Sequence, residues 1–192
     1  MKIFGPLYER VLGWSRHRHA PWYLGGLSFA ESSFFPIPPD VMLAPMALAR
    51  PERWVFLATL TTLASVLGGL FGYLIGWLAI DLIEPYIHAW GYGEAYATAR
   101  AWFADWGFLA VLVAGFSPIP YKIFTITAGA LTMNLPLFLA ASFAGRGGRF
   151  YLVAWLVAKA GPGMEPVLRR YVEWLGWLVI LGAVAAYLAF RH

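Results

Sequence analysis

The chain contains no cysteine and few charged residues. Of its 192 residues only 12% are charged, whereas 60% are hydrophobic and 18% are aromatic. A soluble domain usually carries about 25% charged residues because its surface must be hydrated. The 14 Lys and Arg are offset by 10 Asp and Glu, which argues against a strongly basic nucleic-acid-binding protein. Without cysteine, disulfides and thiolate metal sites are excluded. The composition therefore predicts an integral membrane protein of a single domain.

Two uncharged stretches predict membrane-spanning helices. Residues 54–80 form a run of 27 residues, and a helix needs roughly 20 to cross the hydrocarbon core. Within this run Gly68, Gly72 and Gly76 recur at every fourth position, which predicts a helix face that another backbone can approach closely. Residues 174–190 form a shorter run of 17 residues and are predicted to be another span.

Two further apolar regions are interrupted and are not predicted to be plain spanning helices. Residues 20–49 contain two acids and five prolines, and residues 107–158 contain three basic residues. Proline lacks a backbone donor and pushes the preceding residue toward extended geometry, so a helix entering at Trp22 is expected to break near Phe35. Irregular backbone at membrane depth is tolerated only where it is buried in protein or lines a wet cavity.

Two segments are predicted to lie as interfacial helices at the membrane surface. Apolar residues within 1–19 recur with helical spacing on one face, as in an amphipathic helix. Residues 85–106 are rich in tyrosine and tryptophan, which settle at the level of the lipid headgroups.

The two interrupted regions contain related motifs. FFPIPPD at 34–40 matches FSPIPYK at 116–122 at an offset of 82 residues, with four identical positions in seven. The shared prolines are Pro36, Pro38, Pro118 and Pro120. A long apolar segment follows each motif, at 54–80 and at 134–158. The predicted unit is therefore a broken hairpin, at 20–49 or 107–132, followed by a spanning helix.

The distribution of lysine and arginine orients this repeat. With a cytoplasmic N-terminus and two re-entrant hairpins, nine of the 14 Lys and Arg lie inside, two outside and three in the membrane region. The hairpins then enter from opposite faces, an inverted repeat that places a transporter's site near the bilayer midplane. A rival topology makes 107–121 and 123–145 full spans, with 146–149 as a cytoplasmic loop.

Five charged residues fall at membrane depth, where a charge costs about 2.5 to 3.5 kcal/mol on insertion scales. Glu31 and Asp40 are predicted to exchange protons, although Asp40 would also suit a helix cap. Lys122, Arg146 and Arg149 are predicted to bind an anionic group, because an arginine fork holds phosphate bidentately. Two structural alternatives to anion binding remain. The Lys122 side chain could snorkel to the membrane interface, and the chain around the two arginines could form a flexible loop. As counterparts in the repeat, Lys122 and Asp40 are expected to face each other.

The order of acid, proline motif, glycine helix and second proline motif resembles the DedA family, also called the VTT or SNARE-associated Golgi protein domain. The resemblance covers roughly residues 20–160, and the second motif is similar to that of the YqaA-like bacterial subgroup. It implies two facing re-entrant hairpins in the bacterial inner membrane and a role in envelope homeostasis. It also implies functional roles for Glu31 and Asp40. Many members carry arginine where Gly115 stands here, and Arg146 or Arg149 is expected to supply that charge.

The resemblance further implies translocation of a lipid such as undecaprenyl phosphate or a phospholipid, driven by the proton motive force. We therefore expect an all-α polytopic flippase or scramblase for an anionic lipid, with membrane lipids and protons as partners. We expect no cofactor, no metal, no nucleic acid and no enzymatic activity, and a homo-oligomer is left open. A proton-coupled transporter of small ions or osmolytes and a lipid-binding scaffold are the alternatives.

Overall fold

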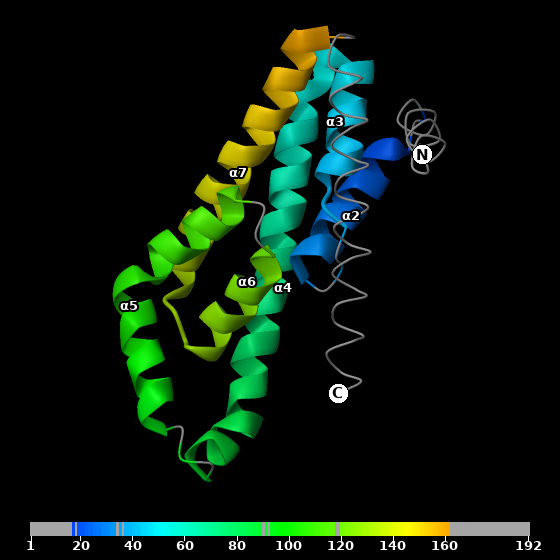
Figure 1. Ribbon diagram of the computed structural model, residues 1–192. Coiled ribbons are helices and arrows are strands. Elements are labelled where there is room, and N and C mark those ends of the chain that lie inside the picture. The colour runs from blue at the N-terminus through cyan, green and yellow to red at the C-terminus, as the bar shows by residue number, and fades with distance from the viewer. Residues whose placement is uncertain are drawn as a thin grey trace, which may run out of the picture.

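The computed structural model describes residues 17, 19–33, 35, 37–89, 91, 93–117 and 120–161. Every regular element in these ranges is a helix (Figure 1), so the predicted all-α class is confirmed for this part of the chain. The elements are α2 (Ala20–Ser33), α3 (Asp40–Ala49), the 3-10 turn η1 (Pro51–Arg53), α4 (Trp54–Ala89), α5 (Gly93–Phe116), α6 (Tyr121–Ala130) and α7 (Leu135–Ala160). Almost all of the predicted interfacial helix at 1–19 and the whole predicted span at 174–190 lie outside the described residues.

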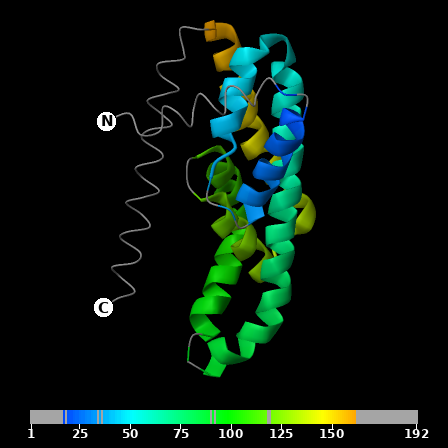
Figure 2. The ribbon, with the colours of Figure 1, turned by 90° about the vertical axis from the view of Figure 1, so that its right-hand side faces the viewer.

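The long helix α4 forms the axis of the molecule (Figures 1 and 2). Its 36 residues continue past the predicted end at Ile80 as far as Ala89. By length and composition, Pro51–Ala89 and Tyr96–Phe116 can each cross a membrane. Large apolar side chains are exposed along the helices, among them Trp22, Leu67, Trp77, Leu82, Trp102 and Leu137. Such a surface suits contact with lipid rather than with water.

The first proline motif breaks the chain where the sequence predicts. Helix α2 ends at Ser33 and α3 begins at Asp40. Ser28 on α2 hydrogen-bonds the Thr61 carbonyl of α4, and Ser32, one turn later, hydrogen-bonds Ser65, also one turn later. Helix α2 therefore runs parallel to α4 and ends near its middle. Since α3 leads through η1 into the first turn of α4, this hairpin opens toward the N-terminal end of α4.

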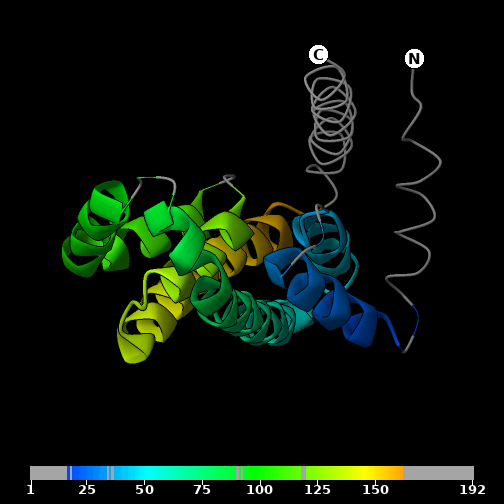
Figure 3. The ribbon, with the colours of Figure 1, turned by 90° about the horizontal axis from the view of Figure 1, so that it is seen from below.

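The second proline motif separates α5 from α6 in a second hairpin. Helix α5 starts near the C-terminal end of α4 and ends at Phe116, and α6 then runs beside α4 from the level of Gly69 to that of Gly76. Consequently the second hairpin opens toward the C-terminal end of α4, and the two tips approach each other near its middle. Seen from below, α2 and α3 lie on one side of α4 and α5 lies on the other (Figure 3).

Two expected boundaries are wrong. The segment 85–106, expected as one interfacial helix, is divided between the end of α4 and the start of α5, and α5 continues through residue 107 without a break. The rival topology is also wrong, because α6 ends at Ala130 and α7 passes unbroken through 146–149. The Asn134 side chain caps α7 by accepting a hydrogen bond from the Leu137 amide at 3.2 Å, which stabilises the predicted helix start.

Glycines allow α2 and α6 to pack against the backbone of α4. A Cβ at Gly68 would overlap the Phe29 carbonyl of α2, and one at Gly76 would overlap the Ile126 carbonyl of α6. Gly72 lies between them, where a Cβ would overlap the Thr125 hydroxyl. Close backbone contact of this kind is how small residues join helices in membranes.

Buried apolar side chains form two clusters, and each cluster belongs to one hairpin. The first joins α2 and α3 to the start of α4 and the end of α7, and the second joins α5 and α6 to the start of α7. On α4 a buried polar stretch that includes Thr61, Thr62 and Ser65 separates the two clusters. The buried Arg146 occupies the matching position on α7. A polar layer therefore crosses the protein near the middle of α4.

Candidate functional site

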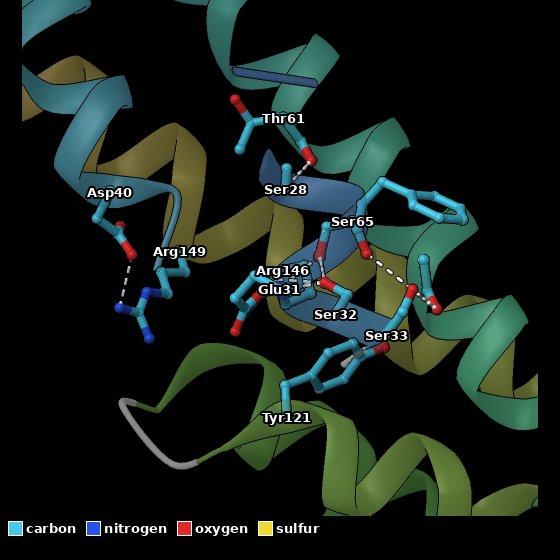
Figure 4. Close-up of polar contacts among 12 residues, drawn as sticks. Ser28, Glu31, Ser32, Ser33, Asp40, Thr61, Ser65, Tyr121, Arg146 and Arg149 are labelled. Carbon is cyan, nitrogen blue, oxygen red and sulfur yellow. Dashed lines mark hydrogen bonds and ion pairs between the residues drawn. The ribbon is translucent and has the colours of Figure 1, made fainter. Parts of the chain in front are cut away.

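Four charged side chains meet in this polar layer (Figure 4). Glu31 lies in the last turn of α2, and Asp40 is the first residue of α3. Arg146 and Arg149 lie on α7, three residues apart and thus on one helix face. The two proline-broken regions and α7 therefore supply opposite charges to one place.

Arg146 forms a buried ion pair with Glu31. Its Nη2 donates to Glu31 Oε2 and, at 3.3 Å, to Ser32 Oγ. Its Nε donates to Ser65 Oγ at 2.6 Å. The Ser32 hydroxyl lies 3.1 Å from Glu31 Oε2 and 2.7 Å from Ser65 Oγ. Only 3% of the Arg146 side chain is exposed, so its charge depends on these partners rather than on water.

Two aromatic rings enclose the same guanidinium group. The Arg146 Cζ lies 4.9 Å from the ring centroid of Tyr121 and 4.7 Å from that of Phe150, within the range of cation–π attraction. The Tyr121 hydroxyl donates to Ser142 Oγ at 2.5 Å, which fixes the ring. Tyr121 is the first residue of α6, so the second hairpin also contacts the Glu31–Arg146 pair.

Arg149 connects the tips of the two hairpins. Its Nη2 donates to Asp40 Oδ2 at 2.8 Å, and its Nη1 donates to the backbone carbonyl of Ser117 at 2.7 Å. Asp40 directly follows the first break, and Ser117 directly follows α5. A guanidinium presents its donors as a rigid planar fork, so one side chain can hold both acceptors at once.

The second pair is less completely satisfied than the first. Asp40 is 6% exposed, and its Oδ1 is buried without a hydrogen-bond partner among the described residues. An unpartnered buried oxygen of a charged group is costly. Arg149 is 14% exposed, against 3% for Arg146. The acids show the reverse order, with 13% of the Glu31 side chain and 7% of the Asp40 side chain exposed. The smaller set of hydrogen bonds around Asp40 therefore gives the Asp40–Arg149 pair the lower cost of opening.

The pairing differs in one respect from the sequence expectation. The ion-pair partner of Asp40 is Arg149, whereas Lys122 was expected to face it. Lys122 lies half-buried in the first turn of α6. The Asp40 carboxylate makes an ion pair rather than a cap, since the N-cap position of α3 is Pro39. Around the arginines the chain is helical, not a flexible loop.

Some contributors were missed by the sequence reasoning, and two predicted residues are not described. Pro38 and Pro120 flank the breaks, whereas Pro36 and Pro118 lie outside the described residues. The missed contributors surround Arg146: they are the hydroxyl groups of Ser32 and Ser65 and the ring of Tyr121. Ser65 had a signal, because it follows Thr61 and Thr62 in the uncharged run and lies one turn before the glycine series.

A family model, the VTT domain, matches residues 34–159. The chain belongs to this family, the DedA family. The family comprises membrane proteins that are generally transporter-like and regarded as non-enzymatic. The residues that the family model matches include Asp40, Lys122, Arg146 and Arg149, whereas Glu31 lies just before the start of the match.

Among relatives in this family, the chain is 47% identical to an uncharacterized protein of Haemophilus influenzae over 192 residues. It is 46% identical over 191 residues to an uncharacterized protein of Histophilus somni. Each alignment covers 100% of both chains. No solved structure matches the chain.

Proposed function

We propose that this protein moves an anionic lipid, a polyprenyl phosphate or a glycerophospholipid, between the leaflets of a bacterial inner membrane. The observation that carries this proposal is the meeting of two acid–arginine pairs halfway along a helix long enough to span the bilayer. Ionisable residues at membrane depth generally mark substrate or ion pathways. Membership in a family of transporter-like membrane proteins supports the same reading.

The pairs offer a way to bind phosphate without leaving a charge unpaired. Carboxylate and phosphate both accept the two parallel hydrogen bonds of an arginine. When the acid is ionised, the arginine is neutralised by the protein itself. When the acid takes up a proton, the arginine is free to pair with a lipid phosphate. Proton uptake and lipid binding would therefore be linked at a pair that can open.

The two pairs have different parts in this proposal. The Glu31–Arg146 pair is enclosed by Ser32, Ser65 and aromatic rings, so it positions the first hairpin on α7. In the second pair Arg149 is more exposed than Arg146, and Asp40 Oδ1 has no hydrogen-bond partner among the described residues, so the Asp40–Arg149 pair exchanges with substrate. Lys122, on α6, would add positive charge beside the headgroup.

Access to the site would come through the hairpins. In the proposed topology the N-terminus is cytoplasmic and the hairpins are re-entrant from opposite faces of the membrane. Arg149 contacts Asp40 at one tip and Ser117 at the other. Release of Asp40 by protonation therefore loosens a direct link between the tips, which opens a polar path past them.

A reconstitution experiment tests the proposal. Protein in liposomes is assayed for transfer of fluorescent phospholipid or polyprenyl phosphate between leaflets, with an impermeant quencher reporting the exposed headgroups. Asp40→Asn and Arg149→Gln should reduce transfer at least as strongly as Glu31→Gln. Glu52→Gln, on the exposed turn η1, serves as the control and should match the unsubstituted protein.

Two outcomes would count against lipid transfer. Undiminished rates in both Asp40→Asn and Arg149→Gln would overturn the role of the pair. Flux of small cations, anions or osmolytes through the unsubstituted protein, without lipid transfer, would instead favour the small-solute transporter.

A further inference from the structure

Tyr121 brings the second hairpin into contact with the buried ion pair of the first. It is the first residue of α6, directly after the second proline motif, and it is completely buried. Its ring lies against the Arg146 guanidinium, with 4.9 Å between the ring centroid and Cζ. Glu31, on α2, binds the same guanidinium. One cation therefore contacts a partner from each hairpin (Figure 4).

Two neighbouring helices fix the Tyr121 ring in this position. Its hydroxyl donates to Ser142 Oγ at 2.5 Å, and Ser142 lies one turn before Arg146 on α7. The same hydroxyl packs against Gly69 of α4, where a Cβ would come within 3.1 Å of it. The ring is thus held by α4 and α7 together. It leaves the guanidinium when the second hairpin moves away from these two helices.

The carboxylate and the ring can each stabilise the buried cation when the other is lost. Since only 3% of the Arg146 side chain is exposed, water does not replace a lost partner. A cation–π contact is worth more when the cation is desolvated, and it is worth most when no carboxylate neutralises the charge. Loss of Glu31 leaves the Tyr121 ring, and loss of the ring leaves Glu31. Moving both hairpins away at once therefore costs more free energy than the two separate movements together.

We propose that Tyr121 is a positioning residue that makes opening of the two hairpins mutually exclusive. Release of the first hairpin strengthens the attraction of Arg146 for Tyr121 and keeps the second hairpin closed. Movement of the second hairpin strengthens the Glu31–Arg146 pair and keeps the first closed, because linkage is reciprocal. Phe150 also contacts the guanidinium, but it lies on α7 with Arg146 and does not depend on either hairpin. The inference rests on the proposed function in taking the hairpins as the two access routes.

Two buried thiols measure the opening of each hairpin separately. The chain has no cysteine, so Ser28→Cys on α2 and Thr125→Cys on α6, made one at a time in the full-length protein, each place a single thiol at a fully buried position. N-ethylmaleimide reacts with the thiolate, so its rate in reconstituted vesicles reports the entry of water at that position. Glu31→Gln should speed the reaction of Ser28→Cys and slow that of Thr125→Cys. Tyr121→Leu should do the reverse, with changes of about tenfold, the scale of a desolvated cation–π contact.

The opposite signs separate this linkage from a loss of stability, which exposes both thiols. Tyr121→Phe keeps the ring and removes only the hydroxyl, so it should restore nearly the rates of the parent protein. Tyr151→Leu is the matched control, because it removes a ring of α7 that contacts Trp54 rather than Arg146; it should shift both rates in one direction or leave them unchanged.

Faster reaction of both thiols in Tyr121→Leu would overturn the proposal, as would equal rates in Tyr121→Leu and Tyr121→Phe. The thiol rates involve no lipid transfer. A failure of this proposal therefore leaves the lipid-transfer assay to decide the proposed function, and a failure of lipid transfer leaves the measured linkage in place.

Discussion

Glu31 and Asp40 are both paired with arginine, but the two pairs respond differently to loss of charge. Arg146 is enclosed by hydroxyl groups and aromatic rings, and its side chain is 3% exposed. Arg149 is 14% exposed and has the Ser117 carbonyl as a second acceptor. A buried arginine without a counter-charge is costly, because water cannot replace the lost partner. The acids should therefore differ in their contribution to stability.

Glu31→Gln is expected to destabilise the protein by about 3 kcal/mol, the lower end of the range for breaking a buried ion pair. Asp40→Asn should cost about 1 kcal/mol or less, because Arg149 retains the Ser117 carbonyl and the asparagine carbonyl oxygen can still accept from Arg149. Thermal unfolding in detergent, followed by circular dichroism, measures both. Glu52→Gln on η1 is the control. Equal losses for Glu31→Gln and Asp40→Asn would contradict the assigned difference.

At the scale of elements, the packing of α6 on α4 depends on two glycines, one on each helix, that contact the backbone of the other helix. A Cβ at Gly76 would overlap the Ile126 carbonyl, and one at Gly129 would overlap the Tyr73 carbonyl. Because both obstacles are backbone atoms, no change of rotamer can relieve them. The two helices would have to move apart, and Tyr73 would then lose its hydrogen bond to Met133.

Gly76→Ala is accordingly expected to destabilise the protein by about 1 to 3 kcal/mol through overpacking. The matched control is Gly26→Ala on α2, where a Cβ would meet nothing within 4 Å. That change should be neutral or stabilising by up to about 1 kcal/mol, because alanine favours helix. The midpoints of thermal unfolding in detergent compare them. Similar midpoints for the two variants would show that α4 and α6 are not closely packed.

The helices could be predicted from the sequence where a residue imposes its own geometry. The first proline motif ends α2 at Ser33, close to the expected Phe35, and Asn134 caps α7 as a helix start. The end of α4 was not predictable in this way. Pro85 lies inside α4, and the chain turns only near Gly91, whose φ is 81°. An interior proline can either kink or break a helix, and the local pattern around Pro85 does not decide between the two.

The four charged residues of the ion pairs could be predicted from the sequence, but their pairing could not. Spacing places Arg146 and Arg149 on one face of α7, and the cost of charge at membrane depth identifies all four partners as candidates. Which acid meets which arginine depends on the levels at which α2, α3 and α7 pack along α4. Those levels are set by glycine contacts and by apolar clusters between distant segments, which no local pattern encodes.

At the scale of the whole molecule, the two hairpins open toward opposite ends of α4 and meet near its middle. The link between α3 and α4 lies at one end, in η1, and the link between α4 and α5 lies at the other, near Gly91. If α4 crosses the membrane, these two links lie on opposite sides of the bilayer. Six of the 14 Lys and Arg precede α4, whereas Arg100 is the one Lys or Arg in 81–106, on the far side of α4; this distribution predicts that η1 is cytoplasmic.

The absence of cysteine makes this orientation directly measurable. Glu52→Cys on η1 and Glu94→Cys at the start of α5 place one thiol at each end of α4, both at exposed positions. In intact cells a membrane-impermeant maleimide should label Glu94→Cys only, and Glu52→Cys should react only after the membrane is opened. Because α4 lies between the two positions, labelling of both in intact cells would mean that α4 does not cross. The hairpins would then enter from one side, and the ion pairs on α7 could not lie between two opposed access routes.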